Sequence, residues 1–251
     1  MPEPEVDVAL AKAFAARWMS PTSTGVPPRP HFRPPTGHAN PRPPTWEWPD
    51  VVRVLEAQQA GRFAELAAQV WESFVQRRFK SLLVTSAHRA EGRTTFALLL
   101  AKALIHPERK AVLIETDFYQ PSLARSLNLR SPVTLEDLVA PRPAPTSNLT
   151  QAAEGPLWLI PLRAAIKHPR ELVASPAWHC LMAKLRREFD LIVLDGAPLL
   201  TGQAAVLPRT SVDASVLVFR RAKDAERGLN RAREALIGAG IPLLGLAENL
   251  V

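Results

Sequence analysis

The segment 86–95, SAHRAEGRTT, carries residue types that can bind the phosphates of a nucleotide. It follows an apolar run of strand length and precedes an apolar helix, and backbone N–H groups at such a helix start can hold a phosphate. Thr94 offers a hydroxyl to Mg²⁺, and Arg93 stands where a phosphate-binding loop normally has a lysine. The segment therefore predicts an altered P-loop of a nucleotide-binding domain. Because the strict pattern G-x-x-x-x-G-K-[ST] is not met, an ordinary strand-to-helix turn with Gly92 at its tight point is the alternative.

Carboxylates end two further apolar runs. Glu115 and Asp117 close the segment VLIETD, and Asp195 closes the segment FDLIVLD. An apolar strand that ends in Asp is typical of sites at which a carboxylate holds Mg²⁺ or its water molecules. Taken singly, each acid is more often a helix N-cap or a solvated turn residue than a metal ligand. A hydroxyl and three acids at the strand ends of one sheet favour a shared cation site.

The elements that must position these residues follow from the apolar pattern. Runs of strand length are separated by helical segments, and each run is continuously apolar rather than alternating. This pattern predicts an α/β fold, a doubly wound, mainly parallel sheet flanked by helices, with ligands at the carboxyl ends of the strands. The expected strands are 81–86, 111–115, 157–161, 190–195, 214–219 and 242–247, and the expected helices are 94–105, 120–128, 170–188 and 224–239.

The part of the chain before this sheet divides by composition. Residues 1–19 predict a short amphipathic helix, and residues 20–45 contain nine prolines and predict an extended, proline-rich linker. Residues 46–80 are expected to form leading helices packed on the core, with a break at Gly61. Residues 81–251 would then be the P-loop nucleotide-binding domain.

Composition limits the partners and the compartment. The formal charge is +7, yet the basic residues are scattered and form no run of five, so no nucleic acid partner is expected. The single cysteine, Cys180, fits a reducing cytoplasm, and its apolar neighbours predict a buried packing residue. No apolar run approaches the roughly 20 residues that span a bilayer. We therefore expect a cytoplasmic protein without a transmembrane segment, recruited to the inner face of the membrane by a partner.

Taken in order, the motifs resemble those of the bacterial tyrosine kinases (BY-kinases) of capsule and exopolysaccharide synthesis, which belong with the septum-placement and chromosome-partition ATPases. The family patterns S-A-x-P-G-E-G-K-[ST]-T, D-x-D-x-R-x-P and D-x-P-P lie over 86–95, 115–121 and 195–198. The segments ELVASP and GLAENL match two further family motifs. The resemblance extends over roughly residues 70–251.

The resemblance implies a role for each matching residue. Asp117 would be the catalytic base or the organiser of Mg²⁺, and Arg93 would contact the phosphates during transfer to a tyrosine of a partner protein. Thr94, Asp117 and Asp195 would form the metal shell. ATP and Mg²⁺ are the implied cofactors. The implied nucleotide-binding residues are Ala90, Glu91, Gly92, Arg93, Thr94, Thr95 and Asn249.

The resemblance also implies partners. A membrane protein of polysaccharide export or chain-length control would anchor or activate the chain. A homo-oligomer is implied as well, although the ring-forming pattern E-x-x-R-x-x-R lies over Glu72 to Arg78 with Val75 in place of its first arginine. The family's tyrosine-rich tail has no counterpart, because Tyr119 is the one tyrosine of the sequence.

The sequence departs from the family where the chemistry would occur. Arg93 replaces a lysine with a longer, planar fork, and Glu115 replaces an Asp with a side chain that is one methylene longer. Ala90 replaces a glycine, and it would be strained if position 90 needs a positive φ. These departures and the missing tyrosine-rich tail argue against normal kinase activity, whereas the four oxygen-bearing side chains at the strand ends argue for retained binding of a Mg-nucleotide.

Three hypotheses for the function follow from this comparison with the family. The first is a BY-kinase-like protein that binds Mg-ATP and phosphorylates or regulates a partner in exopolysaccharide synthesis or export. The second is a degenerate pseudokinase or scaffold module with weak or no nucleotide binding. The third is a partition-type ATPase that positions cargo. His88 counts against the third, because it stands at the signature lysine of those ATPases.

Overall fold

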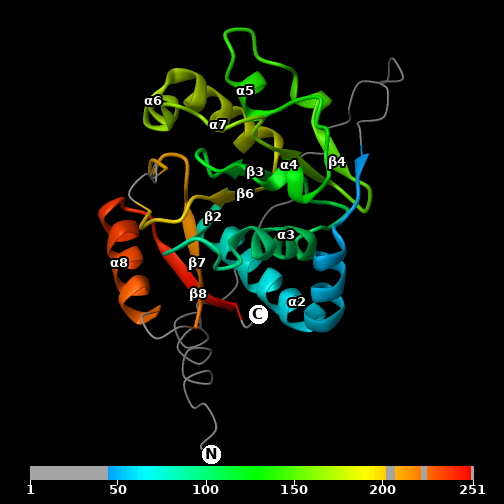
Figure 1. The fold of residues 1–251 in the computed structure, drawn as a ribbon. Coiled ribbons are helices and arrows are strands. Elements are labelled where there is room, and N and C mark those ends of the chain that lie inside the picture. Colours follow the sequence, from blue (N-terminus) through cyan, green and yellow to red (C-terminus); the bar gives the residue numbers. More distant parts are fainter. Residues whose placement is uncertain (1–44, 202–206, 222–224, 250–251) are drawn as a thin grey trace, which may run out of the picture. The chain divides into compact units, whose positions relative to one another are not determined.

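The computed structural model describes residues 45–201, 207–221 and 225–249 (Figure 1). The predicted helix over 1–19 lies outside these residues, as does nearly all of the predicted linker over 20–45. The strands are β1 (Thr45–Trp46), β2 (Ser81–Ser86), β3 (Ala111–Thr116), β4 (Thr150–Ala152), β5 (Leu157–Ile160), β6 (Leu191–Gly196), β7 (Ala214–Arg220) and β8 (Leu243–Asn249). The helices are α2 (Asp50–Arg77), α3 (Arg93–Ala103), α4 (Leu123–Ser126), α5 (Leu135–Leu138), α6 (Pro169–Ala174), α7 (Pro176–Glu188) and α8 (Ala225–Gly238), with a 3₁₀ turn η1 (Thr146–Asn148).

The described strands form one sheet in the order β1-β4-β5-β3-β6-β2-β7-β8. Every neighbouring pair is parallel except β4 with β5. The four central strands β3, β6, β2 and β7 are paired in close register, so their carboxyl ends meet at one edge. The predicted mainly parallel α/β sheet is confirmed.

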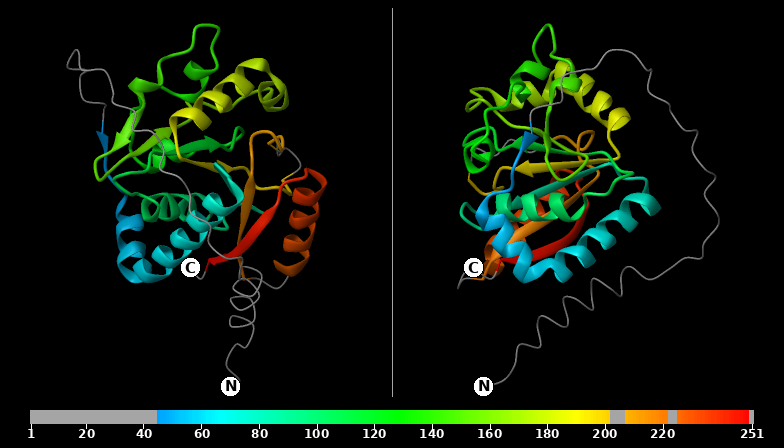
Figure 2. Two further views of the ribbon diagram at one scale, coloured as in Figure 1. Left: turned by 180° about the vertical axis from the view of Figure 1, so that it is seen from behind. Right: turned by 90° about the vertical axis from the view of Figure 1, so that its right-hand side faces the viewer.

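Helices cover both faces of the sheet, as the continuous apolar strands predicted (Figure 2). Successive residues of a strand point to opposite faces, so a strand buried on both sides must be apolar throughout. In β2, Leu82 and Val84 pack in one core with α2 and α3, whereas Leu83 packs in the other with α7 and α8. The fold is therefore doubly wound.

Helix α2 runs without interruption through Gly61, so the predicted break at that residue is wrong. A glycine inside a helix costs about 1 kcal/mol relative to alanine, which a well-buried helix can tolerate. Val70 and Phe74 on the inner face of α2 are nearly inaccessible to solvent and pack in the core shared with α3. The apolar face thus outweighs the low helix propensity of one residue.

The predicted helix over 170–188 is divided in two at Ser175. Ser175 has the extended conformation that a residue before proline favours, and Pro176 then opens α7. The hydroxyl of Ser175 accepts the N–H of Trp178 and so caps the new helix. The predicted helix over 120–128 is likewise shorter than expected, and the sequence did not indicate α5, β1 or β4.

Cys180 is exposed, so its prediction as a buried packing residue is wrong. Trp178, Leu181 and Leu185 of α7 are buried, and they lie three and four residues apart on one face of the helix. Cys180 falls between them in sequence but on the outer face in space. Apolar neighbours in sequence are therefore a poor guide to burial in a helix.

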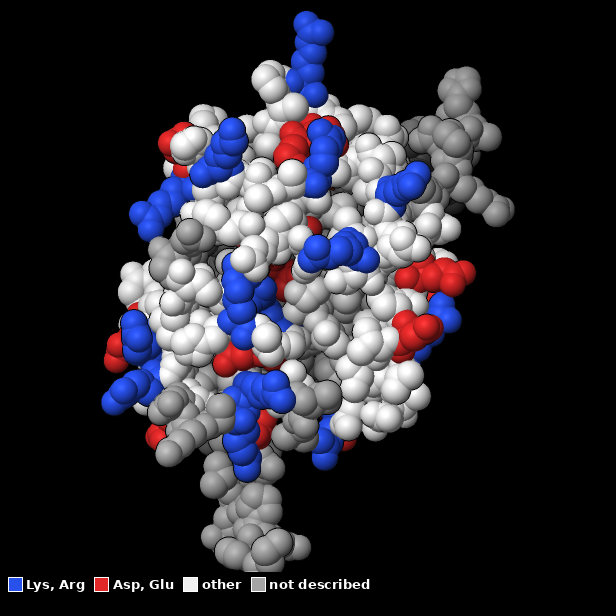
Figure 3. Space-filling model, viewed as in Figure 1, with Lys and Arg blue, Asp and Glu red and all other residues white. Residues whose placement is uncertain are grey.

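Charged side chains are spread over the face of the domain that Figure 3 shows. Lys and Arg side chains are interspersed with Asp and Glu side chains over much of this face, and several Lys and Arg side chains gather near its middle (Figure 3). Among the described residues, no helix has both the length and the apolar character that crossing a bilayer requires.

Candidate functional site

The loop over 87–92 lies between the end of β2 and the start of α3, at the carboxyl edge of the sheet. The hydroxyl of Ser86 donates to the carbonyl of His88 at 2.7 Å, and the N–H of His88 donates to Glu91 Oε2 at 2.7 Å. These contacts hold the loop in a compact turn. Because the first turn of α3 has no side-chain cap, its N–H groups and the positive end of the helix dipole can receive an anion.

Two residues of this loop have a positive φ. Gly92, the N-cap of α3, has φ 83°, and Ala90 has φ 62°. Alanine in the left-handed region is strained by about 1 kcal/mol or more, so position 90 carries the strain expected from the loss of glycine. A Cβ at Gly92 would overlap Nδ2 of Asn249, which donates to the carbonyl of Glu91 at 3.2 Å. Asn249 of β8 therefore lies directly against the loop.

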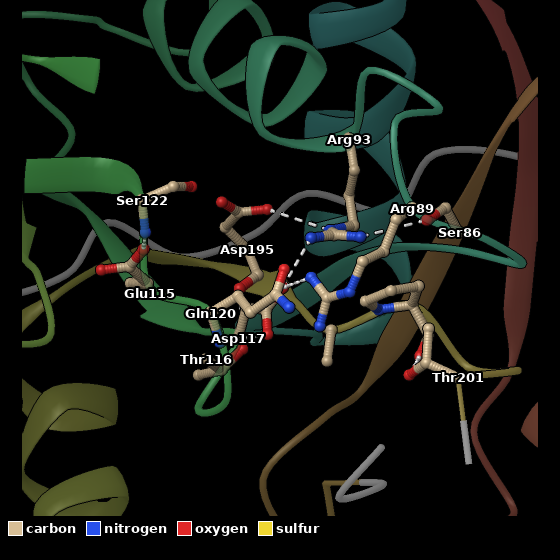
Figure 4. A network of polar contacts seen from close by, with 12 residues as sticks. Ser86, Arg89, Arg93, Glu115, Thr116, Asp117, Gln120, Ser122, Asp195 and Thr201 are labelled. Atoms are coloured by element: carbon tan, nitrogen blue, oxygen red, sulfur yellow. Dashed lines mark hydrogen bonds and ion pairs between the residues drawn. The ribbon is translucent and has the colours of Figure 1, made fainter. Parts of the chain in front are cut away.

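The Arg93 side chain folds back from α3 into the end of the sheet (Figure 4). Its Nη2 donates to Asp117 Oδ2 at 2.9 Å, its Nη1 donates to the hydroxyl of Ser86 at 3.2 Å, and its Nε lies 3.7 Å from Asp195 Oδ1. The side chain is only 10% exposed. Arg93 thus ties the loop to the carboxylates that follow β3 and end β6.

Asp117 is shared by two guanidinium groups. Arg89 Nη1 donates to Asp117 Oδ2 at 3.1 Å, on the same oxygen that Arg93 contacts, and the N–H of Gln120 donates to Asp117 Oδ1 at 3.2 Å. Arg89 is 34% exposed and comes from the loop rather than from the helix. The carboxylate is therefore held in place by contacts to both of its oxygens.

Asp195 lies next to Arg93 and is almost completely buried. Burial raises the pKa of Asp195 to about 7, against the opposing effects of the Arg93 charge and the Thr94 side chain. Among the described residues, neither Asp195 Oδ1 nor Arg93 Nε has a hydrogen-bond partner. These two atoms face each other at a separation that is too long for a hydrogen bond.

Glu115 does not join the other acids, contrary to the interpretation of the sequence. One of its oxygens accepts the N–H groups of Ser122 and Leu123, and the other accepts the N–H of Leu162 at 3.0 Å. Figure 4 shows Glu115 directed toward Ser122 and away from Arg93. Burial raises the pKa of Glu115, although the three backbone hydrogen bonds act in the opposite direction. Glu115 is an anchor for two loops.

The structure brings most of the predicted site residues together. Arg93 contacts both Asp117 and Asp195, and Thr94 interacts with Asp195. Glu91, Gly92 and Asn249 meet at the other side of the loop. Ser86 and Arg89 were missed, since the family pattern has no arginine at position 89 and a serine at a strand end is a weak signal. Ala90 and Thr95 complete the predicted nucleotide-binding set, at the loop and in the first turn of α3.

Comparison with curated proteins identifies relatives among bacterial kinases. The chain is 27% identical over 175 residues to the tyrosine-protein kinase YwqD of Bacillus subtilis, covering 70% of this chain and 74% of YwqD. It is 23% identical over 188 residues to the putative tyrosine-protein kinase CapB of Staphylococcus aureus, covering 75% of this chain and 82% of CapB. No family model matches the sequence.

Solved structures show the same fold. The chimerical protein CapA2B2 superposes with a TM-score of 0.69 at 19% identity, covering 82% of this chain and 93% of that one. The septum site-determining protein MinD of Pyrococcus horikoshii, solved with Mg-ADP, superposes with a TM-score of 0.55 at 20% identity, covering 66% of this chain and 68% of MinD. The described domain is a P-loop NTPase fold.

Proposed function

We propose that this chain, a divergent member of the bacterial tyrosine kinase family, is a nucleotide-binding regulatory module of exopolysaccharide synthesis or export with little phosphoryl transfer of its own. One observation carries the proposal. The loop keeps the strand, the left-handed glycine and the uncapped helix start of a phosphate-binding loop, while the residue in the lysine position is bound to Asp117 and Asp195.

ATP is the proposed ligand. The N–H groups at the start of α3 would hold its phosphates, with Arg93 and Arg89 as the charged donors. Asn249 lies beside Gly92, where it can contact the rest of the nucleotide. If a metal accompanies the nucleotide, Thr94, Asp117 and Asp195 are the residues that would hold it.

The contacts of Asp117 support the proposal that phosphoryl transfer by this chain is slow. Phosphoryl transfer to a tyrosine needs a positioned base that can accept the proton of the attacking hydroxyl. Asp117 Oδ2 already accepts hydrogen bonds from both Arg89 and Arg93, so the oxygen that would have to take up that proton is occupied by two donors. The module would therefore sense nucleotide rather than consume it.

The proposed partner is a membrane protein of polysaccharide export or chain-length control. The support is the similarity to tyrosine-protein kinases such as YwqD and CapB. On this proposal the chain acts on the cytoplasmic side of the membrane. Assembly into a homo-oligomer stays a prediction.

Titration of the full chain with ATP, followed by calorimetry, tests the proposal. We expect saturable heat from ATP, while transfer of labelled phosphate to a synthetic Glu/Tyr copolymer is no faster than in an Asp117→Asn variant. A transfer rate that drops about tenfold or more in that variant would establish the kinase alternative, with Asp117 as its base. Absence of any binding heat would establish the scaffold alternative.

Replacing Gly92 with alanine is expected to weaken nucleotide binding by about tenfold or more, since the left-handed φ and the overlap with Asn249 both displace the loop. The matched control is Gly61→Ala on α2, where an added Cβ meets nothing within 4 Å. We expect that variant to bind nucleotide normally and to gain about 0.5–1 kcal/mol of stability. Equal nucleotide affinities in the two variants would contradict a role for the loop.

A further inference from the structure

The Arg93 guanidinium lies where a divalent cation would have to sit. A metal held by Asp117 and Asp195 must lie between their carboxylates, and Figure 4 shows the Arg93 guanidinium reaching both. The group is fixed there by three contacts, because Nη2, Nε and Nη1 each face a different side chain. Two of the three predicted metal ligands therefore already share one organic cation.

With Arg93 in place, Mg²⁺ has no access to the oxygens that remain, because Asp195 Oδ1, which has no hydrogen-bond partner among the described residues, faces Arg93 Nε at 3.7 Å. Mg²⁺ requires near-octahedral oxygen ligands at about 2.1 Å. Asp117 accepts from two guanidinium groups and from a backbone N–H, and the oxygens of Glu115 are bound by the amides of two loops. Among the described residues, no group of three or more His, Cys, Asp or Glu side chains could hold a metal ion. As arranged, the residues do not fit Mg²⁺.

The charges of the surrounding side chains also disfavour a divalent cation at this position. The guanidinium groups of Arg89 and Arg93 already bring two positive charges to Asp117. Arginine cannot lose its proton in a protein, so these charges persist at every working pH. The carboxylates of Asp117 and Asp195 already face these two positive charges, so a divalent cation would add two further positive charges that no side-chain carboxylate of this pair balances, in a largely buried site where repulsion is only weakly screened.

The same arrangement suits a phosphate chain. A guanidinium binds phosphate oxygens with two parallel N–H donors, which a lysine ammonium cannot do. Arg89 is partly exposed at the loop, where an incoming phosphate would meet it before it met Arg93. The N–H groups of the first turn of α3 add neutral donors that need no metal.

We propose that this site takes a nucleoside polyphosphate free of divalent cation, with the Arg93 guanidinium in the place of the metal and Arg89 as the second charge on the phosphates. This inference rests on the proposed function, because it requires that the loop binds a nucleotide. It specifies the form of that ligand, which is the free anion rather than its magnesium complex. A nucleotide held in this way remains intact and acts as a regulatory ligand.

The test is calorimetric titration of the full chain with ATP and with ADP, first in excess EDTA and then in excess Mg²⁺. We expect affinities in EDTA that equal or exceed those in Mg²⁺. In Arg93→Lys the shorter side chain vacates the space between Asp117 and Asp195, so we expect Mg²⁺ to strengthen binding by about tenfold or more. Arg187→Lys, an exposed arginine near the end of α7, is the matched control and should behave as the native chain does.

The outcomes separate this inference from the proposed function. Binding by the native chain that requires Mg²⁺ overturns the inference and leaves nucleotide binding intact. Absence of binding in both buffers overturns both. If Arg93→Lys binds nucleotide with the same affinity in EDTA and in Mg²⁺, the inference is also overturned. Arg93 would then not be the group that excludes the metal. The comparison of the two buffers in the native chain does not depend on whether the variant folds.

Discussion

Replacing Glu115 with alanine is expected to lower the free energy of unfolding by about 3–9 kcal/mol, since three buried or partly buried backbone N–H groups lose their acceptor at about 1–3 kcal/mol each. The total stability of a domain is usually about 5–15 kcal/mol, so the loss is a large part of it. Urea unfolding followed by circular dichroism measures the effect. Tight coupling between the two loops that Glu115 joins makes a single cooperative transition the expected form of the curve.

Two conservative variants test why the loss of Glu115 lowers the stability. Glu115→Asp keeps the charge but is one methylene too short to reach the amides of both Ser122 and Leu162. Glu115→Gln keeps the length but presents an NH₂ group to one of the N–H donors. Both should fall between the native chain and the alanine variant. If Glu115→Asp were as stable as the native chain, the reach of the longer side chain would not be what joins the two loops.

The fold could be predicted because the apolar pattern within each short segment indicates a buried strand or a helix. Continuous apolar strands such as 81–86 and 190–195 need cover on both faces, and that requirement alone selects a doubly wound parallel sheet. The proximity of Thr94 to Asp195 followed from the same argument, because the loop after β2 and the end of β6 lie at one edge of the sheet. These inferences required no knowledge of where individual side chains point.

The hydrogen-bond partners of Glu115 could not be predicted in the same way. Its partners, the amides of Ser122, Leu123 and Leu162, belong to loops whose paths depend on the whole packed structure. The contact of Arg89 with Asp117 depends likewise on the course of the loop after β2. When a side chain has several possible partners, the tertiary structure determines which of them it contacts. A sequence motif gives only the order of the residues along the chain.

Two helix boundaries were predicted wrongly, and each error came from a single residue or residue pair. The break predicted at Gly61 treated helix propensity as decisive, although burial of one face of α2 outweighs it. The single helix predicted over 170–188 gave too little weight to the Ser175–Pro176 step. Neither error moved a residue of the candidate site, because the ends of the central strands are set by the sheet and not by the helices.

The second large effect is expected at the opposite edge of the sheet, at Asp213. Arg186 donates to both oxygens of Asp213, at 2.7 and 3.0 Å, and the N–H groups of Lys80 and Ser81 donate to Oδ2 at 2.8 and 3.0 Å. Asp213→Ala removes these four hydrogen bonds and a fifth, from the hydroxyl of Ser81 at 3.1 Å, and it leaves the partly buried Arg186 without its carboxylate. Breaking such a pair costs about 3–5 kcal/mol. Urea unfolding at neutral pH measures the loss.

The matched control is Asp190→Ala. Asp190 lies just before β6 at the same edge of the sheet, and it accepts the N–H of Lys110 at 3.1 Å in a more exposed setting. We expect this variant to lose about 1 kcal/mol. Nucleotide binding should be normal in both variants, since this edge is remote from the loop. Equal losses in Asp190→Ala and Asp213→Ala would contradict the importance of the charged pair.

Acid should remove the contribution of Asp213. Burial opposes its charged form, but the hydrogen bonds from Arg186 and from the two backbone N–H groups outweigh burial and hold the pKa of Asp213 below its ordinary value. The unfolded chain therefore binds a proton at a higher pH than the folded chain does. The stabilisation is complete above the ordinary pKa of Asp and declines as the pH falls through the lowered value. Unfolding curves at neutral and acidic pH should thus show the native chain converging toward Asp213→Ala in acid, because protonation and substitution remove the same charge.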